Sequence, residues 1–158
     1  MDVTTFYALF SATCFTLVGL WWGVTTRDTA WVGDPARRRA IGGVYLAFLL
    51  PALMGLFAQV GGVEEPVVWR LSFVVIAIVG CVTTLRLFAH DTDPALRSIR
   101  VGAGVIYVLV ALLGLVPGAA DLVGLRPIQV EALLLVLLVA LGHALVWRHL
   151  VDEAGSTR

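Results

Sequence analysis

Long apolar stretches alternate with short polar segments along the whole sequence. Each apolar stretch is close to the length of about 20 residues that an α-helix needs to cross the hydrocarbon of a bilayer. We therefore predict five transmembrane helices, at 5–26, 39–60, 67–88, 101–119 and 128–150. They use most of the 158 residues, so the sequence predicts an all-α integral membrane protein with a single transmembrane domain over 1–158.

The connections between these stretches carry glycine, proline and acidic residues, which end and restart helices. Asp34 precedes Pro35, and Asp93 precedes Pro94. Each pair fits the N-cap and the first position of a helix. We therefore expect the second and fourth helices to begin as short extensions outside the hydrocarbon.

The composition agrees with a membrane protein. Hydrophobic residues make up 59% of the chain and charged residues 14%, whereas about 25% of a typical soluble domain is charged. Mean hydropathy is +0.94. The formal net charge is zero, so nothing in the composition favours nucleic acid as a partner.

Arginine is distributed unequally between the two sides of the predicted bundle. Nine of the 11 basic residues fall on one side, at positions 27, 37, 38, 39, 86, 97, 100, 148 and 158. Only Arg70 and Arg126 fall on the other. The positive-inside rule places the larger group in the cytoplasm. We therefore predict a protein of the cell membrane with its N-terminus outside and its C-terminus inside.

The sequence also contains an internal repeat. Sliding it on itself by 59 residues aligns 34–56 with 93–115. Matched positions include Asp34-Pro35-Ala36 with Asp93-Pro94-Ala95, Arg38 with Arg97, Gly43 with Gly102 and Gly55 with Gly114. We interpret the first two and the next two helices as parallel copies of one helical hairpin, followed by an unpaired fifth helix.

One face of the 5–26 helix carries small residues. Its members follow helical spacing and are Thr5, Ala12, Thr16, Gly19, Gly23 and Thr26. Such a face permits close backbone approach, and Gly19 and Gly23 form a GxxxG pattern. It is either a pore wall or subunit seam, or a contact with another helix of the same subunit.

Two groups of polar residues fall inside the predicted helices. Near the outer side, Arg70 and Glu131 are expected at similar depth, where an ion pair would lower the cost of burying them, with Gln59 completing the group. This outer cluster is either an ion-selective mouth or a lock between two helices. Near the inner side, Thr83, Thr84, Arg86 and His143 are expected at one level.

His143 would act there in proton relay or gating, or would form a hydrogen bond with a neighbouring helix. Pro51 lies in the middle of the 39–60 helix, where it removes a backbone donor and is a candidate hinge. The sequence contains no nucleotide-binding loop, no metalloprotease motif and no converging histidines. We therefore expect no enzyme activity, no catalytic residues, no metal site and no cofactor.

These features favour a small oligomeric ion channel, or a channel-like transporter for a small ion, with the small-residue face at the assembly axis or pore. The alternative is a non-conducting accessory or sensory subunit that docks on a larger membrane protein. A lipid-modifying enzyme is a third hypothesis, which rests only on the interfacial arginines and His143. The lipid bilayer and a second copy of the chain are the expected partners.

Overall fold

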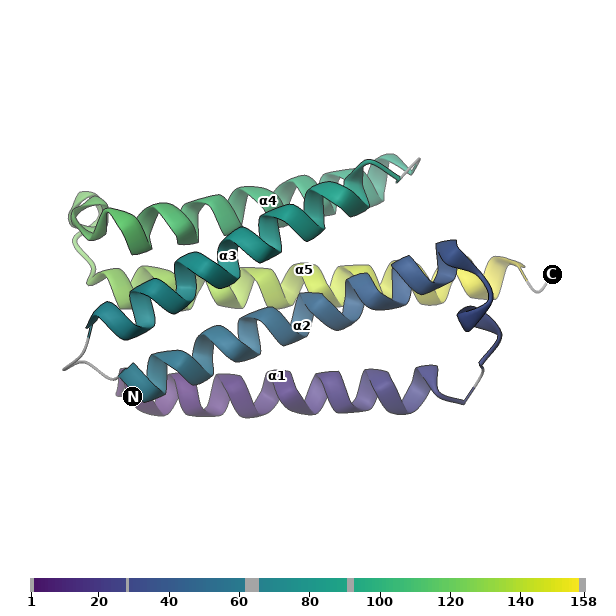
Figure 1. The fold of residues 1–158 in the computed structure, drawn as a ribbon, viewed down its shortest axis with the longest axis horizontal. Helices are drawn as coiled ribbons and strands as arrows, with labels where there is room; N and C mark the ends of the chain where they lie inside the picture. The colour runs from purple at the N-terminus through teal and green to yellow at the C-terminus, as the bar shows by residue number, and fades with distance from the viewer. Residues whose placement is uncertain (1, 28, 62–65, 91–92, 157–158) are drawn as a thin grey trace.

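The computed structural model describes residues 2–27, 29–61, 66–90 and 93–156 and consists of helices (Figure 1). The five long helices are α1 (Val3–Thr25), α2 (Pro35–Gly61), α3 (Pro66–Phe88), α4 (Pro94–Leu115) and α5 (Pro127–Ser156). Two short 3₁₀ helices, η1 (Ala30–Val32) and η2 (Pro117–Val123), lie in connections. All five long helices have the length and apolar composition needed to cross a membrane, as predicted.

The expected helix starts are confirmed at α2 and α4. The Asp34 carboxylate accepts a hydrogen bond from the Ala36 N–H at 2.8 Å, and Asp93 accepts one from the Ala95 N–H at 2.9 Å. These side chains satisfy backbone donors that have no partner within the helix. Both helices therefore begin before the apolar stretch, at the proline that follows the acidic residue.

The predicted end of the fourth helix at residue 119 is wrong. α4 ends at Leu115, and Val116 adopts φ −124° and ψ 76°. Pro117 disfavours the α conformation at the residue before it, which explains the break. The chain then continues as η2 and reverses direction through Gly124, whose φ of 65° suits glycine.

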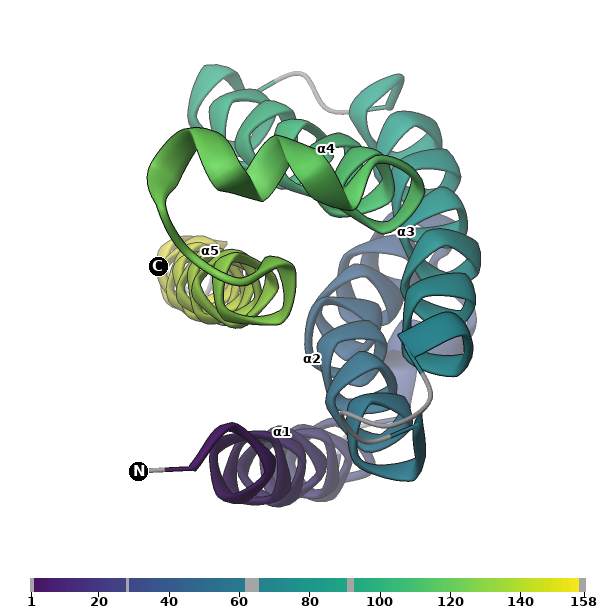
Figure 2. The same ribbon diagram turned by 90° about the vertical axis from the view of Figure 1, so that its left-hand side faces the viewer.

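Helix α2 lies at the centre of the bundle. It packs against α1, α3 and α5, and α4 completes the arrangement by packing against α3 and α5. Viewed along the bundle, α3 and α5 lie on different sides of α2, and α1 lies below it (Figure 2). Among the described residues, no Cα atom of α3 lies within 8 Å of a Cα atom of α5, although side chains of both helices belong to the same buried core.

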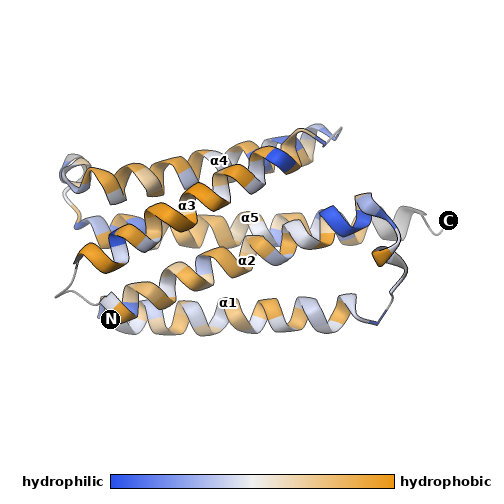
Figure 3. Ribbon diagram, in the orientation of Figure 1, coloured by the Kyte–Doolittle hydropathy of each residue, from blue (hydrophilic) through white to orange (hydrophobic). Residues whose placement is uncertain are grey.

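The bundle has a buried core and an apolar outer surface. Its largest fully buried side chains include Tyr7, Phe48, Phe73, Met54 and Leu135. Large apolar side chains such as Leu20, Leu71 and Leu115 are more than 60% exposed, and hydrophilic residues gather toward the helix ends (Figure 3). This is the distribution expected when lipid rather than water surrounds the middle of the bundle.

The chain termini lie at opposite ends of the bundle (Figure 1). One end, called the arginine-rich end here, combines the C-terminal ends of α1, α3 and α5 with the N-terminal ends of α2 and α4. It carries Arg39, Arg86, Arg97, Arg100 and Arg148. The other, called the far end, carries Arg70 and Glu131.

Each of the first two hairpins has a glycine that lies close to the preceding helix. In the first hairpin, Gly55 of α2 lies against Ser11 of α1. In the second, Gly114 of α4 lies against the backbone of Arg70 on α3. Positions 55 and 114, like positions 11 and 70, are separated by the 59 residues of the sequence repeat. Both glycines therefore lie at a close contact between the two helices of their hairpin.

Candidate functional site

One face of α5 joins the polar groups at the two ends of the bundle. Residues at helical spacing form this face, called the α5 inner face here, and they are Glu131, Leu135, Leu138, Gly142, Leu145 and His149. The first five are buried, and His149 is half-buried. A titratable side chain thus stands at each end of a buried stripe.

At the far end, Glu131 is completely buried, with an exposed fraction of 0%. Among the residues that the structure describes, neither of its carboxyl oxygens has a hydrogen-bond partner. The Tyr7 hydroxyl lies near this carboxyl group, but it donates its hydrogen bond to the Ile128 carbonyl oxygen at 2.7 Å. Glu131 is therefore a buried ionisable group without a polar partner, which is costly in any medium that excludes water.

Gln59 belongs to the same region through Tyr7. Its side-chain amide donates to the carbonyl oxygen of Tyr7 at 3.3 Å and to that of Gly55 at 3.2 Å. Tyr7 thus connects α1 to Gln59 on α2 and to Ile128 on α5. Tyr7 was not expected in the cluster, because an aromatic residue near a helix end gives no sequence signal beyond that of an interfacial anchor.

The expected ion pair between Arg70 and Glu131 does not form. The Arg70 Nε–H donates to the Gly114 carbonyl oxygen at 2.9 Å, and Nη2 donates to that of Leu115 at 3.4 Å. These carbonyls lie at the C-terminal end of α4, where partners within the helix are missing and positive charge is favoured. Arg70 on α3 thus bonds to α4, whereas Glu131 is on α5, and no described Cα atom of α5 lies within 8 Å of one in α3.

At the arginine-rich end, a cavity of about 350 Å³ lies between the ends of α2, α3, α4 and α5. Its polar side chains are Arg39, His90, Asp93, Arg100 and His149. Two of these are on the α4 end and one is on the α5 inner face. The cavity thus brings together polar residues from three separate parts of the sequence.

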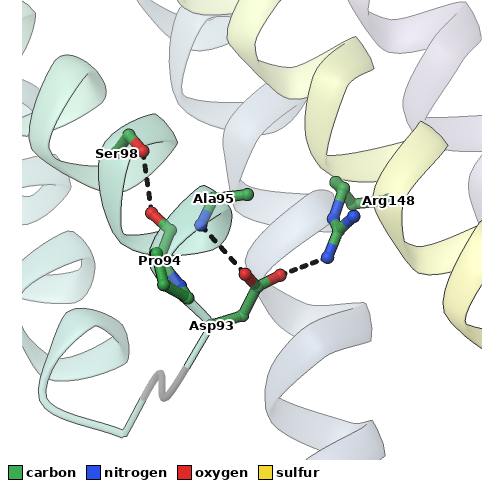
Figure 4. A network of polar contacts seen from close by, with 5 residues as sticks. All are labelled: Asp93, Pro94, Ala95, Ser98 and Arg148. Atoms are coloured by element: carbon green, nitrogen blue, oxygen red, sulfur yellow. Dashed lines mark hydrogen bonds and ion pairs between the residues drawn. The ribbon is translucent and has the colours of Figure 1, made fainter.

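Asp93, which lines this cavity, contacts both the start of α4 and Arg148 of α5 (Figure 4). Its carboxylate caps α4 through the Ala95 N–H and forms an ion pair with Arg148 of α5. The Ala95 N–H, and next Arg148, hold the pKa of Asp93 below its ordinary value of 3.8, against an opposing effect of desolvation. Arg148 therefore neutralises the one acidic side chain described in the cavity wall.

A second, narrow space of about 30 Å³ extends into the bundle from this cavity. The two share Leu87, Arg100 and Leu145 as lining residues, and the narrow space reaches Leu138 on the α5 inner face. Leu135, which is fully buried, lies between Leu138 and Glu131 on that face.

The expected inner cluster is not assembled. Thr83 and Thr84 line the narrow space, but Arg86 and His143 are exposed. His143 Nδ1 is paired with the Val139 carbonyl oxygen at 2.9 Å, and its ring contacts Phe48 edge-on at 5.2 Å. Helix rotation of about 100° per residue explains the separation, since Arg86 follows Thr84 by two positions and His143 follows Gly142 by one.

The small-residue face of α1 points away from the rest of the subunit. Its six residues are all exposed, and a Cβ atom added to Gly19 or Gly23 would meet nothing within 4 Å. The hydroxyl group of Thr16 donates to the Ala12 carbonyl oxygen of the same helix at 2.8 Å. Close packing within the subunit, one of the two interpretations of this face, is therefore wrong.

Pro51 is buried within α2, and the helix continues on both sides of it to Pro35 and Gly61. Its role as a hinge stays a prediction. Within the described parts of the chain, no group of three or more histidine, cysteine, aspartate or glutamate side chains is arranged to hold a metal ion. Cys14 and Cys81 are free thiols.

The sequence also missed the contribution of Arg39, Arg100 and His149 to one cavity. The distribution of arginines along the sequence predicted the end of the bundle at which Arg39 and Arg100 lie. It did not predict that these side chains and His149 line the same cavity. Comparison with protein families, characterised proteins and solved structures finds no match for this chain.

Proposed function

We propose that the protein is a channel-like transporter for a small ion and that it works as an oligomer in the cell membrane. The supporting observation is the α5 inner face. At one end it carries a fully buried carboxyl group without a hydrogen-bond partner, Glu131, and at the other it borders a cavity that reaches inward to Leu138. Intramembrane ionisable residues of this kind commonly mark ion or proton pathways.

Glu131 is the ion-binding group in this proposal. A carboxyl group that lacks hydrogen-bond donors lowers its cost of burial by taking up a proton or a small cation. Leu135 stands between Glu131 and the cavity, so it acts as a hydrophobic gate. In this proposal, transport requires Leu135 to move aside.

Assembly is assigned to α1. The exposed face with Gly19 and Gly23 has open space around both glycines, and small residues of this spacing allow two helices to approach closely. Because α1 has few buried residues, a contact between copies would cover one of the least packed helices of the subunit.

The proposal keeps the orientation predicted from charge, with the arginine-rich end in the cytoplasm. It also keeps the interpretation of the two hairpins as copies of one unit. The matched contacts of Gly55 with Ser11 and of Gly114 with Arg70 support that interpretation. The cavity then opens to the cytoplasm, and Glu131 lies near the outer surface.

The second candidate is a non-conducting accessory subunit. The closure of the bundle at the fully buried Leu135 favours it. In this case the exposed α1 face would dock on a larger membrane protein, and the arginine-rich end would be its cytoplasmic contact.

Flux measurements separate the two candidates. Liposomes that contain the purified protein are given proton, potassium or chloride gradients one at a time. We expect a proton or potassium gradient to collapse faster than in protein-free liposomes, and Leu135→Ala to accelerate this because it widens the closed region. Leu133→Ala, on the exposed side of the same helix, is the matched control.

Thermal unfolding confirms that each variant is folded before its flux is compared. If the wild-type protein and folded Leu135→Ala transport no ion faster than protein-free liposomes, the transport proposal is wrong and the accessory subunit is favoured.

A further inference from the structure

The cavity at the arginine-rich end has the composition of an anion site. Asp93 is paired with Arg148, which is not itself a lining residue. Arg39 lines the cavity and forms no hydrogen bond or ion pair within the part of the chain that the structure describes. The volume of about 350 Å³ is within the range of small-molecule sites. The remaining polar side chains of the lining are those of Arg100, His90 and His149, of which Arg100 and His149 also interact with other groups of the protein.

Arg100 connects this cavity to the outer surface of the bundle. It is buried, with an exposed fraction of 7%. A Cβ atom on Gly43 would lie 3.5 Å from both of its terminal nitrogens, so the missing side chain at Gly43 leaves room for the guanidinium group. Arg100 lines the cavity on one side and a groove between α3 and α4 on the other.

The groove is apolar and lies open on the bundle surface. It has a volume of about 390 Å³, and its lining includes Cys81, Leu85, Val101, Val105, Val108 and Leu109. Leu85 and Val101 are more than half exposed. From Val101 to Leu109 the helix rises about 12 Å. A hydrocarbon chain that entered beside Arg100 would therefore follow α4 toward the middle of the bundle.

We infer that Arg39 and Arg100 bind the phosphate of an anionic phospholipid, one acyl chain of which lies in the α3–α4 groove. Arginine binds phosphate oxygens through paired N–H donors, and basic pockets between transmembrane helices bind anionic headgroups. A free phosphate would use the cavity but leave the groove empty. Arg100 lines both the cavity and the groove, and this favours a phospholipid over a free phosphate. This site does not depend on ion transport.

Lipid titration tests the inference. Protein freed of lipid in a neutral detergent is titrated with phosphatidylglycerol, phosphatidylcholine or soluble glycerol 3-phosphate, and its thermal unfolding temperature is followed. We expect phosphatidylglycerol to stabilise the protein at the lowest concentration. Arg39→Gln, an exposed position that folding tolerates, should raise the concentration needed about fivefold, as expected for one lost arginine near an anionic headgroup.

Two matched controls complete the experiment. Arg86→Gln removes an exposed arginine of the same end that does not line the cavity, and it should leave the titration unchanged. Val105→Trp fills the groove and should weaken phosphatidylglycerol binding, whereas Leu112→Trp, beyond the groove on α4, should not.

The inference is wrong if glycerol 3-phosphate stabilises the protein as well as the lipid does, since the cavity then binds a free phosphate. It is also wrong if phosphatidylglycerol and phosphatidylcholine act equally, or if Arg39→Gln and Val105→Trp titrate like their controls. Because the measurement is of stability, none of these results depends on flux.

Discussion

Gly55 of α2 lies so close to Ser11 of α1 that a Cβ atom at position 55 would stand 2.5 Å from the Ser11 Oγ atom. That hydroxyl group donates to the Ala52 carbonyl oxygen at 3.0 Å, so it has little freedom to turn away. At Gly114, the equivalent position of the second hairpin, a Cβ atom would stand 2.6 Å from Val74 Cγ2. Both hairpins therefore need glycine at the same point.

The first prediction concerns these two glycines. Gly55→Ala and Gly114→Ala should each lower stability, because overpacking of a close helix contact costs about 1–3 kcal/mol. Gly19→Ala, which meets open space, should raise stability by up to about 1 kcal/mol through helix propensity. Thermal unfolding in detergent measures all three. Equal stability of Gly55→Ala and Gly19→Ala would contradict the close contact.

The second prediction concerns Arg70 and Glu131. Since the described Cα atoms of α3 and α5 are all more than 8 Å apart and Arg70 donates to the Gly114 carbonyl oxygen, the two side chains should act independently. A double-mutant cycle with Arg70→Gln and Glu131→Gln should give a coupling free energy below about 0.5 kcal/mol. A coupling free energy of about 2 kcal/mol would instead show that Arg70 and Glu131 form the ion pair expected from their similar depth.

The hydropathy pattern predicted the five helices because the bilayer imposes a length on each apolar stretch. The Asp-Pro pairs that begin at Asp34 and Asp93 also predicted two helix starts. An N-cap is a local interaction between residues that are neighbours in the sequence, so the sequence alone is enough to predict it. The end of α4 was predicted at residue 119, beyond its actual end at Leu115, because apolar residues continue past Pro117 although the helix does not.

The candidate site was less predictable because it depends on which helices are neighbours. Depth along a helix follows from the sequence, and it correctly placed Arg70 and Glu131 at the same end. Rotation about the helix axis and the choice of neighbouring helix depend on packing of the whole bundle. This is why Glu131 lies near Tyr7 instead of Arg70, and why Thr84 and His143 are apart.

The third prediction concerns Asp93 and acid. Because its folded-state pKa is below the ordinary value of 3.8, its ionised form contributes stability that is fully present above that value and is lost as pH falls through the folded-state pKa. Asp93→Asn should therefore flatten the fall in unfolding temperature below pH 3.8. Arg148→Gln should flatten it only in part, since the Ala95 N–H remains. An unchanged acid profile in Asp93→Asn would refute this account.

The fourth prediction concerns the exposed α1 face. Gly23→Leu should leave the folded subunit as stable as the wild type, because nothing lies within 4 Å of a Cβ atom there. If copies assemble through this face, the same change should shift the protein toward a smaller species by mass measurement in detergent. Val24→Leu, an exposed position on another side of α1, is the control. An unchanged assembly in Gly23→Leu would remove α1 from the interface.

The most direct test of the transport proposal compares ion flux through wild-type protein and Glu131→Gln in liposomes, at matched protein content and confirmed folding. Asp121→Asn, which neutralises an exposed carboxylate at the far end, is the control. We expect Glu131→Gln to reduce proton or potassium flux to the level of protein-free liposomes, while Asp121→Asn keeps the wild-type rate. Wild-type flux through folded Glu131→Gln would show that the buried carboxyl group does not carry the ion.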